Sequence, residues 1–380
     1  MGVFRDVSAI ELGAAAIQAA VERSGIAPGL VDSAVMGCVL PAGLGHVPAR
    51  QAALKAGLPD KTPCTTVNKA CGSAMRAIMI GRDEILAGSA DVVVAGGFES
   101  MTNAPFILAD ARRGRKLGHG AVLDHMLYDA LEDAINRVPG KPADLMGHIA
   151  EEWAGKCGFS RQEQDDYALR SLLSARQANE DGSFAWETAA MTLNARGKST
   201  VVGKDEQPFT TDPAKISLLK PAFRADGTVT PANSSSISDG AAATVLVRES
   251  AADKLGVHCL ARVAGQMNYA DNPRAFPMAP AVAIRNLLAR LGWTVDQVDL
   301  FEVNEAFAVV PMIAMRECGI PLEKMNIHGG ACALGHPVGA SGARIVATLI
   351  GALRKTGGKR GVAAICLAGG EATAIAIEML

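Results

Sequence analysis

The chain has 380 residues, a net charge of -2 and 49% hydrophobic residues. High hydrophobicity with little net charge excludes an intrinsically disordered chain. Basic and acidic residues are nearly balanced, 37 against 39, which argues against a surface built to bind nucleic acid or an anionic membrane. We therefore predict a globular protein with neither a nucleic-acid partner nor a membrane partner.

The sequence favours a cytoplasmic location. No apolar run reaches the roughly 18 residues that cross a bilayer, and the first residues lack the apolar core of a signal peptide. In a reducing compartment the eight cysteines are expected to be free thiols. Each one, taken alone, is more often a small buried hydrophobic residue than a reactive group.

Helices alternate with short apolar strands along most of the chain, a pattern typical of an α/β fold. The first elements are expected as a helix over 10–24, a strand over 31–40, a helix over 74–87 and a buried strand over 91–95 that ends in Gly96 and Gly97. The last are a helix over 280–291, a strand over 298–303, a helix over 341–355 and a strand over 362–367. Residues 102–237 have a different texture, with a charged helix over 161–180 and turn-rich segments, and are interpreted as an inserted domain.

The two ends of the chain resemble each other. Residues Arg23, Gly25 and Asp32 recur as Arg290, Gly292 and Asp299 at a constant offset of about 267 positions. The offset grows slowly toward the end of the chain, where Ala95–Gly97 matches Ala368–Gly370. We interpret this as an internal duplication with small insertions; the alternative is a chance match of common residues.

Cys71 lies directly before a predicted helix, between the small residues Ala70 and Gly72. The positive end of the helix dipole and free N–H groups favour a thiolate there, so its pKa is expected to fall below the usual value of about 8.5. Small neighbours leave room for a substrate. Cys71 is therefore a candidate nucleophile, with a buried structural thiol as the equal alternative.

His328, Cys332 and His336 are spaced by four, which on a helix would form a metal-binding face. Gly329, Gly330, Gly335 and Pro337 make a helix improbable, so no metal site is predicted. The segment is better interpreted as a tight loop that aims His336 before a helix begins at Ser341. An imidazole there could accept a proton from a thiol or donate a hydrogen bond to an oxyanion.

Two further residues lie at strand ends. Cys366 ends a buried strand ahead of Gly369 and Gly370, where packing alone does not require a thiol. Asn304 follows the predicted strand 298–303 and either caps the next helix or has a role in a site.

Four blocks together resemble the signature motifs of the thiolases, in the order of that family and over essentially the whole chain. They are 68–73 (NKACGS), 304–307 (NEAF), 335–342 (GHPVGASG) and 366–370 (CLAGG). The resemblance implies two duplicated α/β halves in a five-layered αβαβα fold, with an inserted loop domain that binds coenzyme A. We expect residues 1–101 with 238–258 to form the first half, 102–237 the insertion and 259–380 the second half.

The resemblance also implies roles. Cys71 would take the acyl group, activated by His336, and Cys366 would act as general acid and base at the α-carbon. One oxyanion hole would be formed by His336 and a water held by Asn304, and the other by the N–H groups of Cys71 and Ala368. Ala368 replaces a glycine of the family.

The resemblance places the coenzyme A contacts at Ser235, Met146, Leu145 and Phe276, of which Leu145 stands where many relatives have histidine. Relatives reach the sequence equivalent to Gly2–Asp6 only after a first β-strand, so an open sheet edge is expected.

The predicted function is condensation of acetyl-CoA to acetoacetyl-CoA and thiolysis of short 3-ketoacyl-CoA, by an acyltransferase. The alternatives are a thiolase for longer or branched chains and a non-catalytic protein of the same fold that binds acyl-CoA. Coenzyme A is a substrate and no cofactor is expected. A homo-oligomer, dimer or tetramer, is expected from the likeness of residues 101–133 to the segment with which thiolases assemble.

Overall fold

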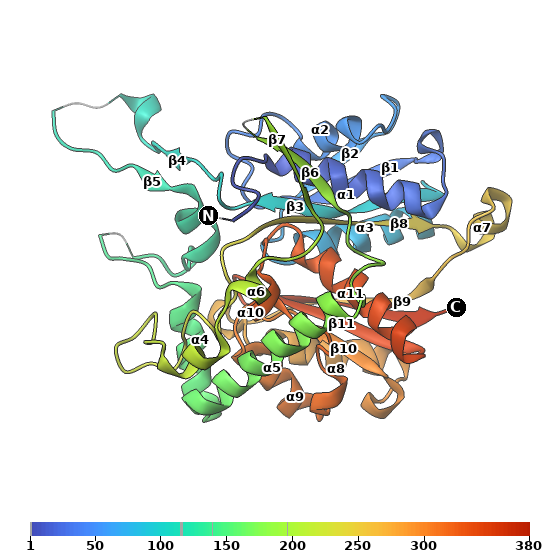
Figure 1. Ribbon diagram of the computed structural model, residues 1–380. Coiled ribbons are helices and arrows are strands. Elements are labelled where there is room, and N and C mark those ends of the chain that lie inside the picture. Colours follow the sequence, from blue (N-terminus) through green and yellow to red (C-terminus); the bar gives the residue numbers. More distant parts are fainter. Residues whose placement is uncertain (1, 115–116, 139, 196) are drawn as a thin grey trace.

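Two four-stranded sheets are stacked with helices between them and on both outer faces (Figure 1). The computed structural model describes residues 2–114, 117–138, 140–195 and 197–380. The first sheet has the order β2-β1-β3-β8 and the second the order β10-β11-β12-β9. The five-layered α/β fold predicted from the sequence is confirmed.

The first sheet comes from the first part of the chain. Its strands are β1 (Ser33–Gly37), β2 (Cys64–Val67), β3 (Val92–Ser100) and β8 (Asp239–Val247), of which only β8 runs antiparallel. Helices α1 (Ala9–Ser24) and α2 (Pro48–Lys55) cover its outer face, and α3 (Ser73–Ala87) lies on the inner face. A capping box between Ser8 and Glu11 begins α1, and Gly25 ends it with a φ of 72°.

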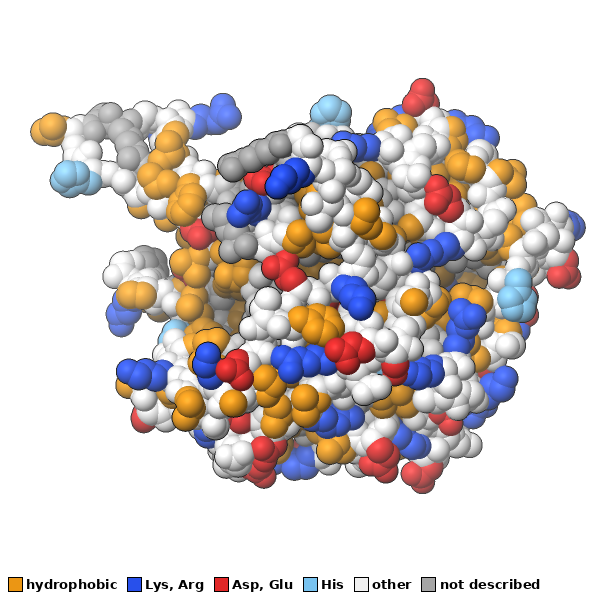
Figure 2. Space-filling view, in the orientation of Figure 1, with side chains coloured by type: hydrophobic (Ala, Val, Ile, Leu, Met, Phe, Trp, Pro, Cys, Tyr) orange, Lys and Arg blue, Asp and Glu red, His pale blue; other side chains and the backbone are white. Residues whose placement is uncertain are grey.

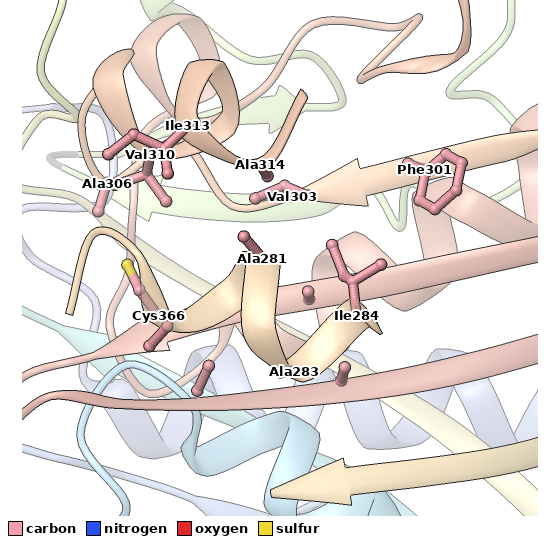
Figure 3. Close-up of a cluster of buried hydrophobic side chains, with 14 of the residues drawn as sticks. Ala281, Ala283, Ile284, Phe301, Val303, Ala306, Val310, Ile313, Ala314 and Cys366 are labelled. Atoms are coloured by element: carbon pink, nitrogen blue, oxygen red, sulfur yellow. The ribbon is translucent and has the colours of Figure 1, made fainter. Parts of the chain in front are cut away.

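The second sheet repeats this plan. Its strands are β9 (Ala261–Ala270), β10 (Leu300–Val303), β11 (Arg360–Leu367) and β12 (Glu371–Met379). Helices α8 (Ala279–Leu291) and α9 (Val309–Cys318) lie on its outer face, α11 (Ser341–Thr356) packs against α3 in the central layer, and α7 (Glu249–Leu255) joins the two halves. Figure 3 shows part of the apolar core between α8, α9 and this sheet.

Asp32 and its repeat, Asp299, make the same kind of hydrogen bonds in the two halves. The Asp32 carboxylate accepts hydrogen bonds from the N–H groups of Asp91 and Val92 at the start of β3, at 2.8 and 3.0 Å. The Asp299 carboxylate accepts from Lys359 and Arg360 at the start of β11, at 2.7 and 2.8 Å. Equivalent residues with equivalent bonds support the duplication read from the sequence.

One strand is longer than predicted. The pattern predicts a strand over 91–95 that ends at Gly96 and Gly97, but β3 continues through both to Ser100, so that boundary is wrong. The glycines serve close approach of other chain segments. A Cβ on Gly97 would lie 1.9 Å from the Gly339 carbonyl oxygen, and one on Gly96 would lie 2.1 Å from the Ala242 carbonyl oxygen.

Residues between the halves form an extended arm and a helical layer. The arm carries the hairpin β4 (Phe106–Ile107) and β5 (Leu123–Asp124) and a short π-helix, Leu127–Leu131. The rest contains α4 (Met146–Cys157), α5 (Arg161–Glu180), the hairpin β6 (Met191–Ala195) and β7 (Lys198–Val202), and α6 (Gln207–Thr210). The charged helix predicted over 161–180 is confirmed as α5.

Strand β8 forms an edge of its sheet. In the second half β9 pairs with β12, whereas no strand of the described residues pairs with the equivalent free side of β8. All nine residues of β8 are accordingly only half-buried, as expected for an uncovered edge. In the described part of the chain, every helix is too short or too polar to pass through a lipid bilayer.

Candidate active site

The candidate nucleophile lies in a strained turn. Cys71 stands between β2 and α3, and Ala70 before it has a φ of 44°, a left-handed conformation that a non-glycine residue adopts only at a cost. The Ser73 hydroxyl holds this turn: it donates to the Ala70 carbonyl at 2.6 Å and accepts from the Lys69 N–H at 2.8 Å. The predicted position of Cys71 directly before a helix is confirmed.

The resting state of Cys71 differs from the expectation. Burial of the sulfur raises the pKa of Cys71 to about 11, and this outweighs the lowering by the N–H groups of Ala368 and of Cys71 itself. The sequence prediction of a lowered pKa is therefore wrong, because it counted the helix dipole and not desolvation. The thiol is protonated at neutral pH and needs a base.

The backbone of Ala368 lies beside Cys71. Both backbone N–H groups point toward the Cys71 sulfur, which is why they lower its pKa. The close fit of Leu367 on Gly72, where a Cβ would lie 2.6 Å from Leu367 Cδ2, brings the two loops together. Two N–H donors therefore lie beside the reacting sulfur, where the oxygen of a bound thioester would also need them.

His336 is a neutral imidazole. It is buried, and burial lowers its pKa to about 3, with a further lowering by the charge of Arg344. Its Nδ1 lies 2.6 Å from the Ser341 hydroxyl, which in turn donates to the Pro337 carbonyl at 3.0 Å. Since a hydroxyl has one hydrogen, we assign the imidazole proton to Nδ1. Nε2 is then an unprotonated base.

The loop that carries His336 contains one short helix, α10 (Ala331–Leu334), and α11 begins at Ser341 as predicted. His328 and His336 lie outside α10, so no helical face joins them to Cys332. Among the described residues, no group of three His, Cys, Asp or Glu side chains is arranged to hold a metal ion.

The Asn304 side chain is buried and unpaired. Helix α9 begins at Val309 with Ala308 as its N-cap, so the interpretation of Asn304 as a helix cap is wrong. Within the described residues, both its side-chain oxygen and nitrogen lack a hydrogen-bond partner, and so does Nε2 of His336. Buried polar side-chain atoms usually have hydrogen-bond partners, and these three atoms are available to bind a substrate or a water. They support the roles predicted for His336, as a base and oxyanion donor, and for Asn304, as the residue that holds a water.

Cys366 lies one residue before the end of β11, and Figure 3 shows its side chain. Strand β11 pairs with β10, which leads into Asn304. Burial, and next the charge of Cys71, raise the pKa of Cys366 well above the usual range. All eight cysteines are free, as predicted.

A cavity of about 120 Å³ opens at Cys71. It is lined by Val39, Ala70, Cys71, Asp129, Ala130, Glu132, Asp133, Ala134, Ile135, Met146, Val338, Ala368 and Gly369. The side chains of His336, Asn304 and Cys366 are not part of this lining. Of the predicted coenzyme A contacts, only Met146 lines the cavity.

The remaining predicted contacts lie elsewhere. Phe276 is buried in the core against Phe307, with ring centroids 6.3 Å apart. Leu145 precedes α4 and donates its N–H to His148 Nδ1 at 2.9 Å. Ser235 donates its N–H to the Ala306 carbonyl at 3.0 Å, close to Asn304 in the chain. Their roles in coenzyme A binding stay predictions.

Two buried carboxylates at the site had been given no role. Glu99, at the end of β3, accepts hydrogen bonds from the Val39 and Leu40 N–H groups at 2.9 and 3.1 Å. Glu305 accepts four hydrogen bonds, described below. The available sequence signal for a role was a charged residue at the end of an apolar strand. The hydrogen-bond partners of each carboxylate come from distant segments, so the sequence did not reveal them.

Comparison with known proteins agrees with this geometry. The thiolase N-terminal domain matches residues 1–250 and the thiolase C-terminal domain matches residues 257–379. The chain belongs to the thiolase family.

Several relatives of this thiolase are similar over almost their full length. Acetyl-CoA acetyltransferase 2 of Arabidopsis thaliana is 47% identical over 100% of this chain and 94% of its own. Acetyl-CoA acetyltransferase of Chromobacterium violaceum is 42% identical over 99% and 95%. Among solved structures, the acetyl-CoA acetyltransferase of Bacillus anthracis has a TM-score of 0.95 and 38% identity, covering 100% of this chain and 95% of its own. Acat5 thiolase of Ascaris suum in complex with coenzyme A has a TM-score of 0.92 and 37% identity, covering 100% and 96%.

Proposed function

We propose that this thiolase converts two molecules of acetyl-CoA into acetoacetyl-CoA and coenzyme A, and catalyses the reverse thiolysis. The observation that carries the proposal is the protonated Cys71 thiol, which lies at a cavity with two N–H groups directed at it. The buried imidazole of His336, whose Nε2 has no partner among the described residues, adds a base outside the lining of that cavity. The names of its relatives, acetyl-CoA acetyltransferases, point to the same reaction.

The first half-reaction moves an acetyl group to Cys71. His336 Nε2 takes the thiol proton while sulfur attacks the thioester carbonyl, and the N–H groups of Cys71 and Ala368 stabilise the oxyanion. As the carbon–sulfur bond to coenzyme A breaks, Cys366 gives its proton to the leaving thiolate. The raised pKa of Cys366 supports this order, because the resting thiol has a proton to donate.

The second half-reaction forms the carbon–carbon bond. The Cys366 thiolate removes a proton from the methyl group of a second acetyl-CoA. The oxygen of the resulting acetyl-CoA enolate is stabilised by protonated His336 and a water held by Asn304. The enolate attacks acetyl-Cys71, and the released Cys71 sulfur recovers its proton from His336. Cys71 recovers its proton from His336, and Cys366 replaces the proton it gave to coenzyme A with one from acetyl-CoA, so the cycle uses no cofactor and coenzyme A remains a substrate.

The size of the cavity favours short acyl groups over the alternative of a long-chain thiolase. A volume of about 120 Å³ beside Cys71 leaves room for a small group only. The Acat5 thiolase of Ascaris suum, which was solved in complex with coenzyme A, supports acyl-CoA as the ligand.

Assembly and location complete the proposal. The arm exposes several large apolar side chains, which Figure 2 shows along the projecting hairpin at the left. Phe106 is 68% exposed and Val122 59%. A surface of this kind is typical of an interface, so we propose a homo-oligomer, dimer or tetramer, assembled through the arm. The eight free thiols support a reducing compartment, for which we propose the cytoplasm. The proposed reaction, on acetyl-CoA and acetoacetyl-CoA, belongs to lipid metabolism.

An assay of acetoacetyl-CoA thiolysis by coenzyme A tests the function. The reaction is monitored as the loss of absorbance of the acetoacetyl-CoA enolate. We expect turnover by the wild type and by Cys318→Ala, whose thiol lies away from the cavity, and none by Cys71→Ala. A wild type that binds acetoacetyl-CoA without turnover would instead indicate the non-catalytic alternative.

A further inference from the structure

One segment supplies more of the Cys71 cavity than any other. Residues 129–135, at the base of the arm, contribute Asp129, Ala130, Glu132, Asp133, Ala134 and Ile135 to its lining. We call residues 129–135 the wall segment. It follows the hairpin of the arm and precedes α4, so it belongs to neither sheet.

The acidic side chains of the wall segment are turned to partners in the protein. Asp129 lies 2.6 Å from His125 Nδ1, and Glu132 accepts from Arg137 Nε at 3.0 Å. Asp133, whose side chain is only 5% exposed, pairs with Arg274 at 3.3 Å. The side chains left to meet an acyl group are therefore the apolar ones.

Ile135 is the largest of these apolar residues, and it lies over the loop that follows β11 and carries Ala368. Its Cδ1 is 3.1 Å from the place where a Cβ of Gly369 would stand, directly after Ala368. Val39 and Val338 line the same cavity and are buried at 4% and 3% exposure. Ile135 is 63% exposed, so it forms the outer side of a cavity whose inner side is fixed in the core.

Arg274 ties the wall segment to the body of the molecule. Besides Asp133 it pairs with Asp144 at 2.9 Å and with Glu152 of α4. Its backbone is held as well, because Trp153 Nε1 donates to the Arg274 carbonyl at 2.6 Å. One guanidinium thus joins the wall segment, α4 and the loop before α8.

We propose that Ile135 sets the length and branching of the acyl group carried on Cys71, and that Arg274 is the positioning residue that keeps Ile135 in place. The inference rests on the proposed function. It assigns acetyl and other short unbranched acyl groups as the substrate class, and it makes the wall segment the determinant that excludes longer or 2-methyl-branched ones.

The test compares Ile135→Ala with Val138→Ala. Val138 is 51% exposed and three residues away, but it does not line the cavity. The kcat/KM values for thiolysis of acetoacetyl-CoA, 3-ketohexanoyl-CoA and 2-methylacetoacetyl-CoA are measured at equal oligomeric state. We expect Ile135→Ala to raise the ratio of the six-carbon or branched substrate to acetoacetyl-CoA by about tenfold, as for added space in an apolar pocket. Equal ratios in Ile135→Ala, Val138→Ala and wild type would overturn the assignment.

Alkylation of Cys71 gives a second readout that does not depend on turnover. Rates with iodoacetamide and the bulkier N-benzylmaleimide are compared by peptide mass mapping. Ile135→Ala should raise the bulky-to-small rate ratio at Cys71 at least about threefold, since the wider opening admits the larger reagent. A wild type without thiolysis would reject the proposed function, whereas unchanged alkylation ratios would reject the wall segment as the limit of the cavity.

Arg274→Gln tests the positioning role, with Asp144→Asn as a control that removes only one of its partners. Arg274→Gln should shift both ratios in the direction of Ile135→Ala, and Arg274→Lys should recover part of the wild-type values. In the double variant with Ile135→Ala, Arg274→Gln should add little, because the two changes act on the same wall. An equal fall in kcat/KM for every substrate, with unchanged ratios, would show a merely structural role for Arg274.

Discussion

Replacing Glu305 by glutamine tests whether one buried carboxylate holds the catalytic loops together. Glu305 is 0% exposed and follows Asn304 directly. Its four hydrogen bonds come from three segments. They are donated by Tyr167 Oη at 3.0 Å and Ser171 Oγ at 2.7 Å in α5, by Asn326 Nδ2 at 2.9 Å, and by the Cys332 N–H at 3.1 Å.

The expected cost follows from how these donors divide between the two oxygens. Oε1 accepts from Tyr167 and Asn326, and Oε2 accepts from Ser171 and Cys332. Glutamine keeps one oxygen. With its NH₂ group in place of Oε2, that group faces the Ser171 hydroxyl and the Cys332 N–H, which are both donors. The Ser171 hydroxyl can rotate to accept, but a backbone N–H cannot, so one buried donor loses its acceptor.

An orphaned buried donor costs about 1–3 kcal/mol, and loss of charge from the remaining bonds adds about 1 kcal/mol. We therefore expect Glu305→Gln to lower the free energy of unfolding by about 2–4 kcal/mol. That is less than the typical total of about 5–15 kcal/mol, so the variant should still fold.

Activity should fall as well. Glu305 fixes the backbone beside Asn304 and, through Cys332, the loop that leads to His336, so a small displacement affects both groups. A roughly tenfold or larger loss in kcat with little change in KM for coenzyme A is expected, since misplaced catalytic groups lose that much.

Urea unfolding at fixed protein concentration and steady-state thiolysis measure the two effects. Glu323→Gln makes the same chemical change at an exposed position and should match wild type in both. Tyr167→Phe, combined with Glu305→Gln in a double-mutant cycle, should show a coupling of about 1 kcal/mol. A Glu305→Gln variant as stable and as active as Glu323→Gln would refute the reasoning.

Three other changes test separate parts of the structure. Burial raises the pKa of Glu302 to about 8, so the folded protein binds a proton that the unfolded chain has lost above pH 4.5, and stability falls as pH rises through this window. Glu302→Gln should therefore reduce the loss of unfolding free energy between pH 5 and 8 by about 3 kcal/mol; parallel pH curves would contradict this. Gly97→Ala sets a Cβ 1.9 Å from the Gly339 carbonyl oxygen and should lower kcat at least about tenfold by displacing the His336 loop, with unchanged kcat as the contrary result. Ser341→Ala removes the partner of His336 Nδ1 and should slow acetylation of Cys71 about tenfold in rapid-quench assays; a wild-type rate would contradict the tautomer assignment.

The sequence could predict most of what lies within one segment. Helix α3 after Cys71, strand β11 that contains Cys366, and helix α11 from Ser341 were expected from local apolar patterns and glycines. Such features depend on neighbours in the chain, which a pattern records. The signature blocks then indicated that Cys71, Asn304, His336 and Cys366 share one site.

Features that depend on contacts between distant segments were not predicted or were predicted wrongly. The extension of β3 through Gly97 reflects the approach of Gly339, about 240 positions away, which local pattern cannot reveal. The prediction of a lowered pKa for Cys71 failed for the same reason, because the surrounding loops set the burial of its sulfur. The tie between Arg274 and Asp133 also joins segments far apart in sequence, and so had no local signal.

Mass spectrometry of the intact protein after incubation with acetyl-CoA tests the central claim most directly. We predict one added acetyl group on the wild type, mapped to Cys71, released by coenzyme A, and absent from Cys71→Ala. A wild type that remains unmodified at Cys71 while its other thiols react normally with an alkylating agent would contradict the acyl-enzyme mechanism.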